Sequence, residues 1–225
     1  MPSIRASNRS WLHVALATCG AALCLAGSAR AEAVAPPVPP ASAPVRVVDQ
    51  LHAALLGVMR DAEKLGYEGR VGRLAPVLKE TYDTPFMAEK SVGRHWKQAS
   101  PAEQAEFVAT FSRFMISNYA GRFDGYSGQS FRTVGEEPSA QGTVLVRTRL
   151  VEPQGEGVEL DYRLRQTNGS WKIVDVYLNG TVSELALRRS EYVSLIKRDG
   201  WQALIAALDD RIASLATAPA DHDLN

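Results

Sequence analysis

The chain has 225 residues, with 25 basic and 25 acidic side chains and a formal net charge of zero. This balance argues against a general nucleic-acid-binding protein, which would carry a basic excess. The length is sufficient for one domain with a hydrophobic core.

The first 31 residues have the three-part pattern of a secretory signal peptide. Arg5 and Arg9 give a basic start, an apolar run covers residues 11–26, and a small-residue site ends at Ala31. At about sixteen residues, the run is shorter than the roughly twenty that span a bilayer as a helix. We therefore expect cleavage after Ala31 and export from the cytoplasm.

Cleavage would change the composition of the protein. It would remove three of the 25 basic residues and no acidic one, leaving 22 against 25 and a net charge of −3. Both cysteines, Cys19 and Cys24, would be lost, so no disulfide or thiol chemistry is expected. Neither cysteine follows the small residues of a lipoprotein site, so we expect no lipidation.

Two flanking segments are not expected to fold. Residues 32–45 are rich in Pro and Ala and should form an extended linker, because they cannot bury enough apolar surface. Residues 218–225 should be a disordered tail. The folded domain is therefore expected over residues 46–217.

The first part of this domain is predicted to be helical. Apolar residues at three- and four-residue spacing predict a helix from about residue 47 to Gly66 and a second over about 69–81. A third, short helix should begin at Thr84, where Thr caps the helix and Pro85 suits its first position.

A fourth helix has the clearest start signal. Ser100 and Glu103 form a capping box, with Pro just inside the helix. The residues that follow form one continuous and unusually aromatic face: Phe107, Phe111, Phe114, Met115, Tyr119 and Phe123.

In the middle of the chain apolar and polar residues alternate, which predicts an antiparallel sheet with one buried and one solvent-exposed face. Asn168-Gly169 is a tight hairpin signal between two of its strands. Four strands are expected, over about residues 130–136, 143–151, 158–165 and 171–178.

From Thr181 onward the pattern predicts helices again, one carrying Val182 to Ile196 and one carrying Leu204 to Leu215, separated at Gly200. Helices, a four-stranded meander and further helices indicate an α+β fold, with a twisted antiparallel sheet packed against helices.

The sequence contains no strong catalytic motif. The histidines of the mature part, His52, His95 and His222, are far apart and have no metal-ligand spacing, so we expect no metal and no cofactor. Asp175, flanked by apolar residues on a strand, is the best candidate for a general base. Alternatively, it faces solvent or pairs with a nearby arginine.

Several segments have the order and spacing of one protein family across about residues 48–216. They include Tyr82–Ala88, Val92–Trp96, Ser100–Phe114, Asp161–Arg165 and Gly169–Val176. Together they resemble the MlaC/toluene-tolerance family of periplasmic lipid carriers.

Two other segments, Phe123–Gly128 and Val176–Ser183, resemble the hopanoid-associated HpnM branch of that family. Asn179 and Thr181 depart from the turn that the general family more often has, so phospholipid and hopanoid both remain possible ligands.

The resemblance implies an NTF2-like core with helical additions around a deep apolar cavity. It also implies a periplasmic shuttle that works with an inner-membrane transporter, as an ABC transporter accessory, and with an outer-membrane acceptor. Each buried methylene contributes about 0.8 kcal/mol to holding a lipid in a membrane, so lipid tails need an apolar site shielded from solvent if they are to cross water. Binding of this kind requires no acid–base chemistry.

The candidate lining of the cavity comes from helices and sheet alike: Phe86, Trp96, Phe107, Phe111, Phe114, Met115, Tyr119, Val146, Leu160, Tyr162, Leu164, Val176, Val193 and Ile196. Arg94, Arg189 and Lys197 are candidate contacts for headgroups or membranes. Two alternatives remain: an isomerase or hydrolase that uses Asp175 and Tyr162, and an accessory module of a transporter that binds no lipid.

Overall fold

Five antiparallel strands in sequential order form an open sheet. The computed structural model describes residues 41–155 and 157–217, so the expected signal peptide and C-terminal tail lie outside the described residues. The strands are β1 (Ser130–Ser139), β2 (Thr143–Val151), β3 (Val158–Thr167), β4 (Ser170–Leu178) and β5 (Val182–Ser183).

The sheet differs from the prediction by its fifth strand. Val182 was assigned to the following helix, but it pairs with Leu178 as part of β5. Asn179 and Gly180 have φ angles of 49° and 70°, and this left-handed turn brings the chain back along β4 before the helix begins. The described sheet is open, so the expected four-stranded NTF2-like core is only an approximate description.

The predicted hairpin between β3 and β4 is confirmed. Asn168 and Gly169 have φ angles of 51° and 80°, as a two-residue turn of this kind requires. Further along this hairpin, the pairing of β3 with β4 shifts by one residue: Arg163 is opposite Asp175, but Leu164 is opposite Ile173. The bulge leaves three consecutive buried residues, 173–175, where strict alternation would bury only every second one.

Four helices and a 3₁₀ helix precede the sheet: α1 (Ala43–Arg60), α2 (Ala62–Thr81), α3 (Thr84–Val92), η1 (Gly93–Gln98) and α4 (Pro101–Arg122). Helix α1 begins before residue 46, capped by the Ser42 side chain. It was predicted to continue to Gly66 but ends at Arg60, and Gly66 instead interrupts α2 with φ 59° and ψ −176°. The predicted capping box of α4 is confirmed at Ser100 and Glu103.

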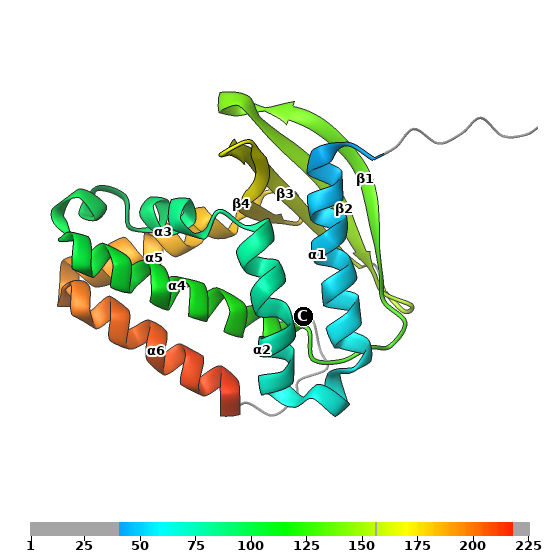
Figure 1. The fold of residues 1–225 in the computed structure, drawn as a ribbon, viewed down its shortest axis with the longest axis horizontal. Helices are drawn as coiled ribbons and strands as arrows, with labels where there is room; N and C mark the ends of the chain where they lie inside the picture. Colours follow the sequence, from blue (N-terminus) through cyan, green and yellow to red (C-terminus); the bar gives the residue numbers. More distant parts are fainter. Residues whose placement is uncertain (1–40, 156, 218–225) are drawn as a thin grey trace, which may run out of the picture. The chain divides into compact units, whose positions relative to one another are not determined.

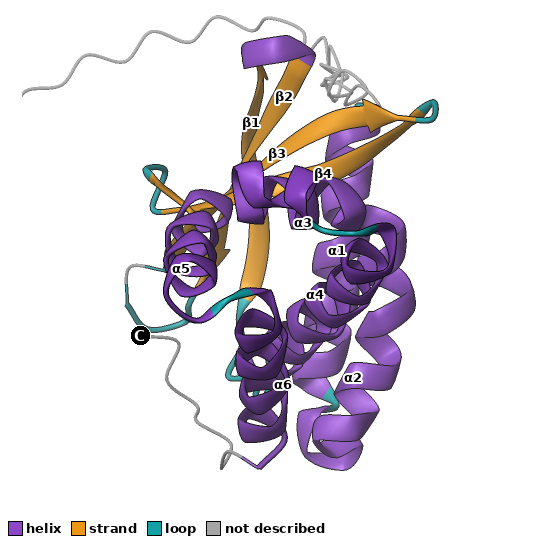
Figure 2. Cartoon of the chain, turned by 90° about the vertical axis from the view of Figure 1, so that its left-hand side faces the viewer, coloured by secondary structure: helices purple, strands orange, loops and turns teal. Residues whose placement is uncertain are grey.

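Two helices follow the sheet, α5 (Glu184–Asp199) and α6 (Trp201–Thr217), separated at Gly200 as predicted. Helix α1 packs on α2 and lies against β1, β2 and β4, while α4 packs against α2, α3 and α6 (Figure 1). Figure 2 shows the helices gathered beside the sheet rather than divided between its two faces. None of the described helices is both long and apolar enough to cross a bilayer.

Candidate functional site: an apolar cavity between helices and sheet

An apolar cavity of about 160 Å³ lies between α4, the start of α5 and the strands β2, β3 and β4. Its uncharged walls consist of aromatic, aliphatic and methionine side chains: Tyr82, Met87, Phe111, Phe114, Met115, Tyr119, Phe123, Leu150, Val158, Leu160, Tyr162, Val176, Leu178 and Leu185. Four polar side chains complete the lining: Asn118, Arg122, Glu184 and Arg188.

The local structure explains why these side chains share one space. On α4 and its C-cap Phe123, the lining residues are Phe111 and then the adjacent pairs 114/115, 118/119 and 122/123, which recur every three to four residues and therefore lie on one face of the helix. On the sheet, Leu160 is paired with Leu178 and Tyr162 with Val176. Residues paired across two strands lie on the same face of the sheet.

Hydroxyl groups in the cavity wall are paired and neutral. The Tyr82 and Tyr119 hydroxyls are hydrogen-bonded to each other, and the Tyr162 hydroxyl lies 3.1 Å from His52 Nε2. Burial raises the pKa of Tyr119 to about 12 and lowers the pKa of His52 to about 3. Near neutral pH this part of the wall therefore carries no charge.

The charged lining residues are all at least partly exposed to solvent. The side chains of Glu184 and Arg188 are 21% and 18% exposed, and their nearest charged atoms are 3.7 Å apart. The Arg188 guanidinium also lies over the Phe114 ring, 4.9 Å from its centroid. Arg122 is exposed at the end of α4. We call these three charged side chains, together with Asn118, the mouth.

The structure brings half of the predicted lining residues together in this cavity. They are Phe111, Phe114, Met115, Tyr119, Leu160, Tyr162 and Val176. These residues come from the aromatic face of α4 and from the inner positions of β3 and β4. Their lining of the cavity is a geometric finding; their contact with a lipid stays a prediction.

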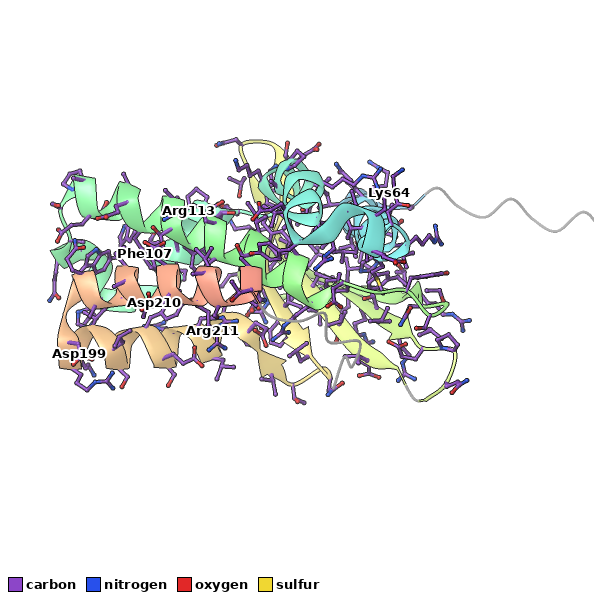
Figure 3. The ribbon with its side chains drawn as sticks, turned by 90° about the horizontal axis from the view of Figure 1, so that it is seen from below. Lys64, Phe107, Arg113, Asp199, Asp210 and Arg211 are labelled. Atoms are coloured by element: carbon purple, nitrogen blue, oxygen red, sulfur yellow. The ribbon has the colours of Figure 1, made fainter. Side chains whose placement is uncertain are left out.

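Three predicted aromatic residues lie outside the cavity. Phe86 packs beneath Arg165, whose guanidinium lies 4.2 Å from the ring centroid. Trp96 lies in η1, against the helical core. Phe107 contacts the Trp201 ring at a centroid distance of 5.3 Å, and Figure 3 places it beside α6. Phe86 thus packs against β3, whereas Phe107 joins α4 to the start of α6.

The four remaining predicted lining residues are aliphatic. Val146 and Leu164 are completely buried and belong to the solid core of the sheet. Ile196 packs against the helical core, and Val193 faces a shallow groove along the outside of α5. Apolar periodicity identifies a buried face, but it does not distinguish a filled core from a cavity wall.

The predicted headgroup contacts are also away from the cavity. Arg94 is exposed in η1, while Arg189 and Lys197 border the groove on the outside of α5. The charged residues at the mouth were not predicted as ligand contacts. In the sequence, Glu184 and Arg188 are two opposite charges four residues apart, and only the position of α5 beside the sheet reveals their location at the cavity.

Sequence reasoning also missed several apolar lining residues. Met87 lines the cavity in place of its neighbour Phe86. Leu150 and Val158 face each other across β2 and β3, and the alternating pattern would have identified both as inward-facing. The other unpredicted apolar members are Tyr82, Phe123, Leu178 and Leu185.

Asp175 has a structural role at the start of α5. Its carboxylate accepts hydrogen bonds from the Ser183 hydroxyl at 2.7 Å and the Leu185 backbone N–H at 3.1 Å. Asp175 pairs with Arg163, one position along from the Tyr162–Val176 pair, and it does not line the cavity. The structure therefore does not join Asp175 and Tyr162 in one site. In the part of the chain that the structure describes, no three His, Cys, Asp or Glu residues are placed to hold a metal ion.

Comparison with known proteins adds a family and a solved structure. A family model described as MlaC protein matches residues 49–210. The fold is similar to that of the phospholipid-binding protein from Ralstonia solanacearum, whose structure was determined in complex with a phospholipid. The two chains are 26% identical with a TM-score of 0.67, and the match covers 79% of this chain and 100% of the other.

Proposed function

Because this chain belongs to the MlaC family, we propose that it is a periplasmic carrier that holds the tails of a membrane lipid in its apolar cavity. The observation that carries this proposal is the cavity wall itself, in which every charged lining residue lies at the mouth. Apolar walls with a few polar groups at one place are typical of sites that take up an apolar ligand. The phospholipid bound to the Ralstonia solanacearum protein supports a lipid as that ligand.

The size of the cavity indicates that lipid binding requires the walls to move. Its volume of about 160 Å³ is smaller than the roughly 300–1,000 Å³ of pockets for drug-sized ligands. Met87 and Met115 are flexible lining residues that adapt to a new shape at low cost. We propose that the tails enter as α4 and the start of α5 separate from the sheet.

A hopanoid is the second candidate ligand, and one observation favours it. The segments that resemble the hopanoid-associated branch, Phe123–Gly128 and Val176–Ser183, both contribute side chains to the cavity wall. Phe123, Val176 and Leu178 are those residues. If the hopanoid-associated branch binds a different ligand from the rest of the family, residues at such wall positions would determine the difference.

The same proposal includes partners and location. A carrier must receive its lipid from one membrane and deliver it to another, because the tails cannot cross water unshielded at a useful rate. We propose an inner-membrane transporter and an outer-membrane acceptor as these partners. The basic start and apolar run of residues 1–31 support export to the periplasm.

Extraction of the purified protein with organic solvent, followed by mass spectrometry, tests the function. Co-purified phospholipid or hopanoid supports the carrier and identifies the lipid class. Protein that contains no lipid and takes up none from vesicles contradicts it and favours a transporter accessory module. Turnover of a small molecule that is lost in Asp175→Asn would instead indicate an enzyme.

A further inference from the structure

The mouth of the cavity contains an ion pair of opposite charges at a position that a lipid headgroup would reach. Glu184 and Arg188 lie on adjacent turns of α5 and are the two partly buried charges of the cavity lining. Their 3.7 Å separation exceeds the roughly 3.2 Å limit of a good N–H···O hydrogen bond. Both groups therefore keep hydrogen-bonding capacity for a third molecule.

We propose that this pair selects zwitterionic headgroups, with Arg188 binding the lipid phosphate and Glu184 binding the ammonium group. The inference rests on the proposed function, since it concerns a lipid whose tails occupy the same cavity. An arginine guanidinium matches the geometry of phosphate oxygens, and a carboxylate accepts N–H bonds from an ammonium group. A headgroup that carries both charges satisfies both members of the pair at once.

The surroundings of Arg188 support its role as the phosphate ligand. Its guanidinium is held over the Phe114 ring, which lines the cavity, at 4.9 Å from the centroid. Its second carboxylate neighbour, Glu191, is 53% exposed and does not line the cavity. Glu184 is therefore the carboxylate that a headgroup at the mouth would meet.

The charge of the mouth also distinguishes two lipid classes. An anionic headgroup that contacts Arg188 brings a phosphate close to Glu184 and has no ammonium group to offset the repulsion. Arg122, the remaining cation of the mouth, is exposed and therefore more strongly screened by solvent. The structure thus favours phosphatidylethanolamine over phosphatidylglycerol when the two are equally abundant.

The test measures which lipid the protein captures from vesicles containing equal amounts of phosphatidylethanolamine and phosphatidylglycerol. Mass spectrometry gives both the total lipid per protein and the ratio of the two lipids. The wild-type protein should be enriched in phosphatidylethanolamine. Glu184→Gln should lower that ratio by about two- to fivefold, the effect of one ion pair that is partly exposed to solvent.

Two further variants complete the test. Arg188→Gln should shift the ratio in the opposite direction, because Glu184 then repels the anionic lipid and only the exposed Arg122 remains as a cation at the mouth. Glu191→Gln is the matched control and should leave the ratio unchanged, although it also removes a carboxylate 3.7 Å from Arg188. If the wild-type protein and the three variants all capture the two lipids in the same ratio, the proposed selectivity is wrong, but the carrier function is not contradicted. No capture by the wild-type protein would overturn both.

Discussion

At the residue scale, the cavity combines apolar walls with buried hydroxyls that are already paired. Tyr162 contributes its ring to the cavity wall and its hydroxyl to His52, which stacks on Phe131 at a centroid distance of 3.9 Å. An unpaired hydroxyl in this environment would cost about 1–3 kcal/mol. The pairing therefore stabilises the fold and leaves the tyrosine hydroxyls of the wall neutral and hydrogen-bonded.

The buried His52 predicts a pH dependence of stability. Its pKa falls from an ordinary value of 6.5 to about 3 because burial disfavours the charged ring. The unfolded chain thus binds a proton that the folded chain does not, and stability present above pH 6.5 is lost as the pH falls. Chemical denaturation should show the free energy of unfolding decreasing by up to about 1.4 kcal/mol per pH unit between pH 6 and 4.5.

The variant His52→Gln should flatten this slope, whereas His95→Gln, in η1, should not. Equal slopes in His52→Gln and the wild-type protein would show that His52 does not cause the pH dependence.

At the element scale, the helix boundaries depend on single backbone positions. Gly66 interrupts α2 with φ 59° and ψ −176°, a conformation that is open essentially only to glycine. Gly57 lies inside α1, and beyond its chain neighbours and the backbone of its own helix nothing lies within 4 Å of the position where a Cβ would be placed. The same substitution at these two positions should therefore have opposite effects.

Gly66→Ala should lower the free energy of unfolding by about 1–3 kcal/mol because of backbone strain. Gly57→Ala should raise it by about 0.5–1 kcal/mol, because alanine loses less conformational entropy in a helix. Denaturant titration measures both. A neutral Gly66→Ala would mean that α2 continues through this position without a break.

These elements also indicate how far the sequence predicts the fold and the site. The capping box of α4 and the Asn168-Gly169 turn are local signals, and both are confirmed. The predicted end of the first helix was wrong: α1 ends at Arg60, and its C-cap Asp61 has φ −98°, a break that no glycine or proline at this position marks. Strand β5 was missed because it depends on the left-handed turn at Asn179 and Gly180, which returns the chain along β4. The mouth was missed for a related reason: only the tertiary placement of α5 turns Glu184 and Arg188 into cavity residues.

At the scale of the whole molecule, the cavity is a space between elements that are distant in sequence. Its walls combine α3, α4, the start of α5 and three strands, and none of these forms a pocket alone. The carrier proposal requires this space to enlarge for lipid and to close when it is empty. Extra bulk on its wall should therefore oppose loading, while equal bulk elsewhere on the sheet should not.

Leu160→Trp places a larger ring in the cavity, and Leu145→Trp makes the same change at a part-buried position of β2 that does not line it. We expect Leu160→Trp to lower lipid affinity by about tenfold or more, a loss of roughly 1.4 kcal/mol. Vesicle uptake followed by mass spectrometry measures this loss, and circular dichroism verifies that both variants fold. Equal lipid uptake by the two variants would show that the lipid does not bind in this cavity.

The location of the lipid can be determined with the methionines that the chain already has. It has four, of which Met87 and Met115 line the cavity and Met59 lies in the core of α1, away from it. The protein would be produced with photo-reactive methionine, loaded with lipid from vesicles and illuminated, and its peptides analysed by mass spectrometry. A lipid held in the cavity should form adducts at Met87 and Met115 and not at Met59. Adducts at Met59 alone, or on neither cavity methionine while lipid remains bound, would contradict the proposed site.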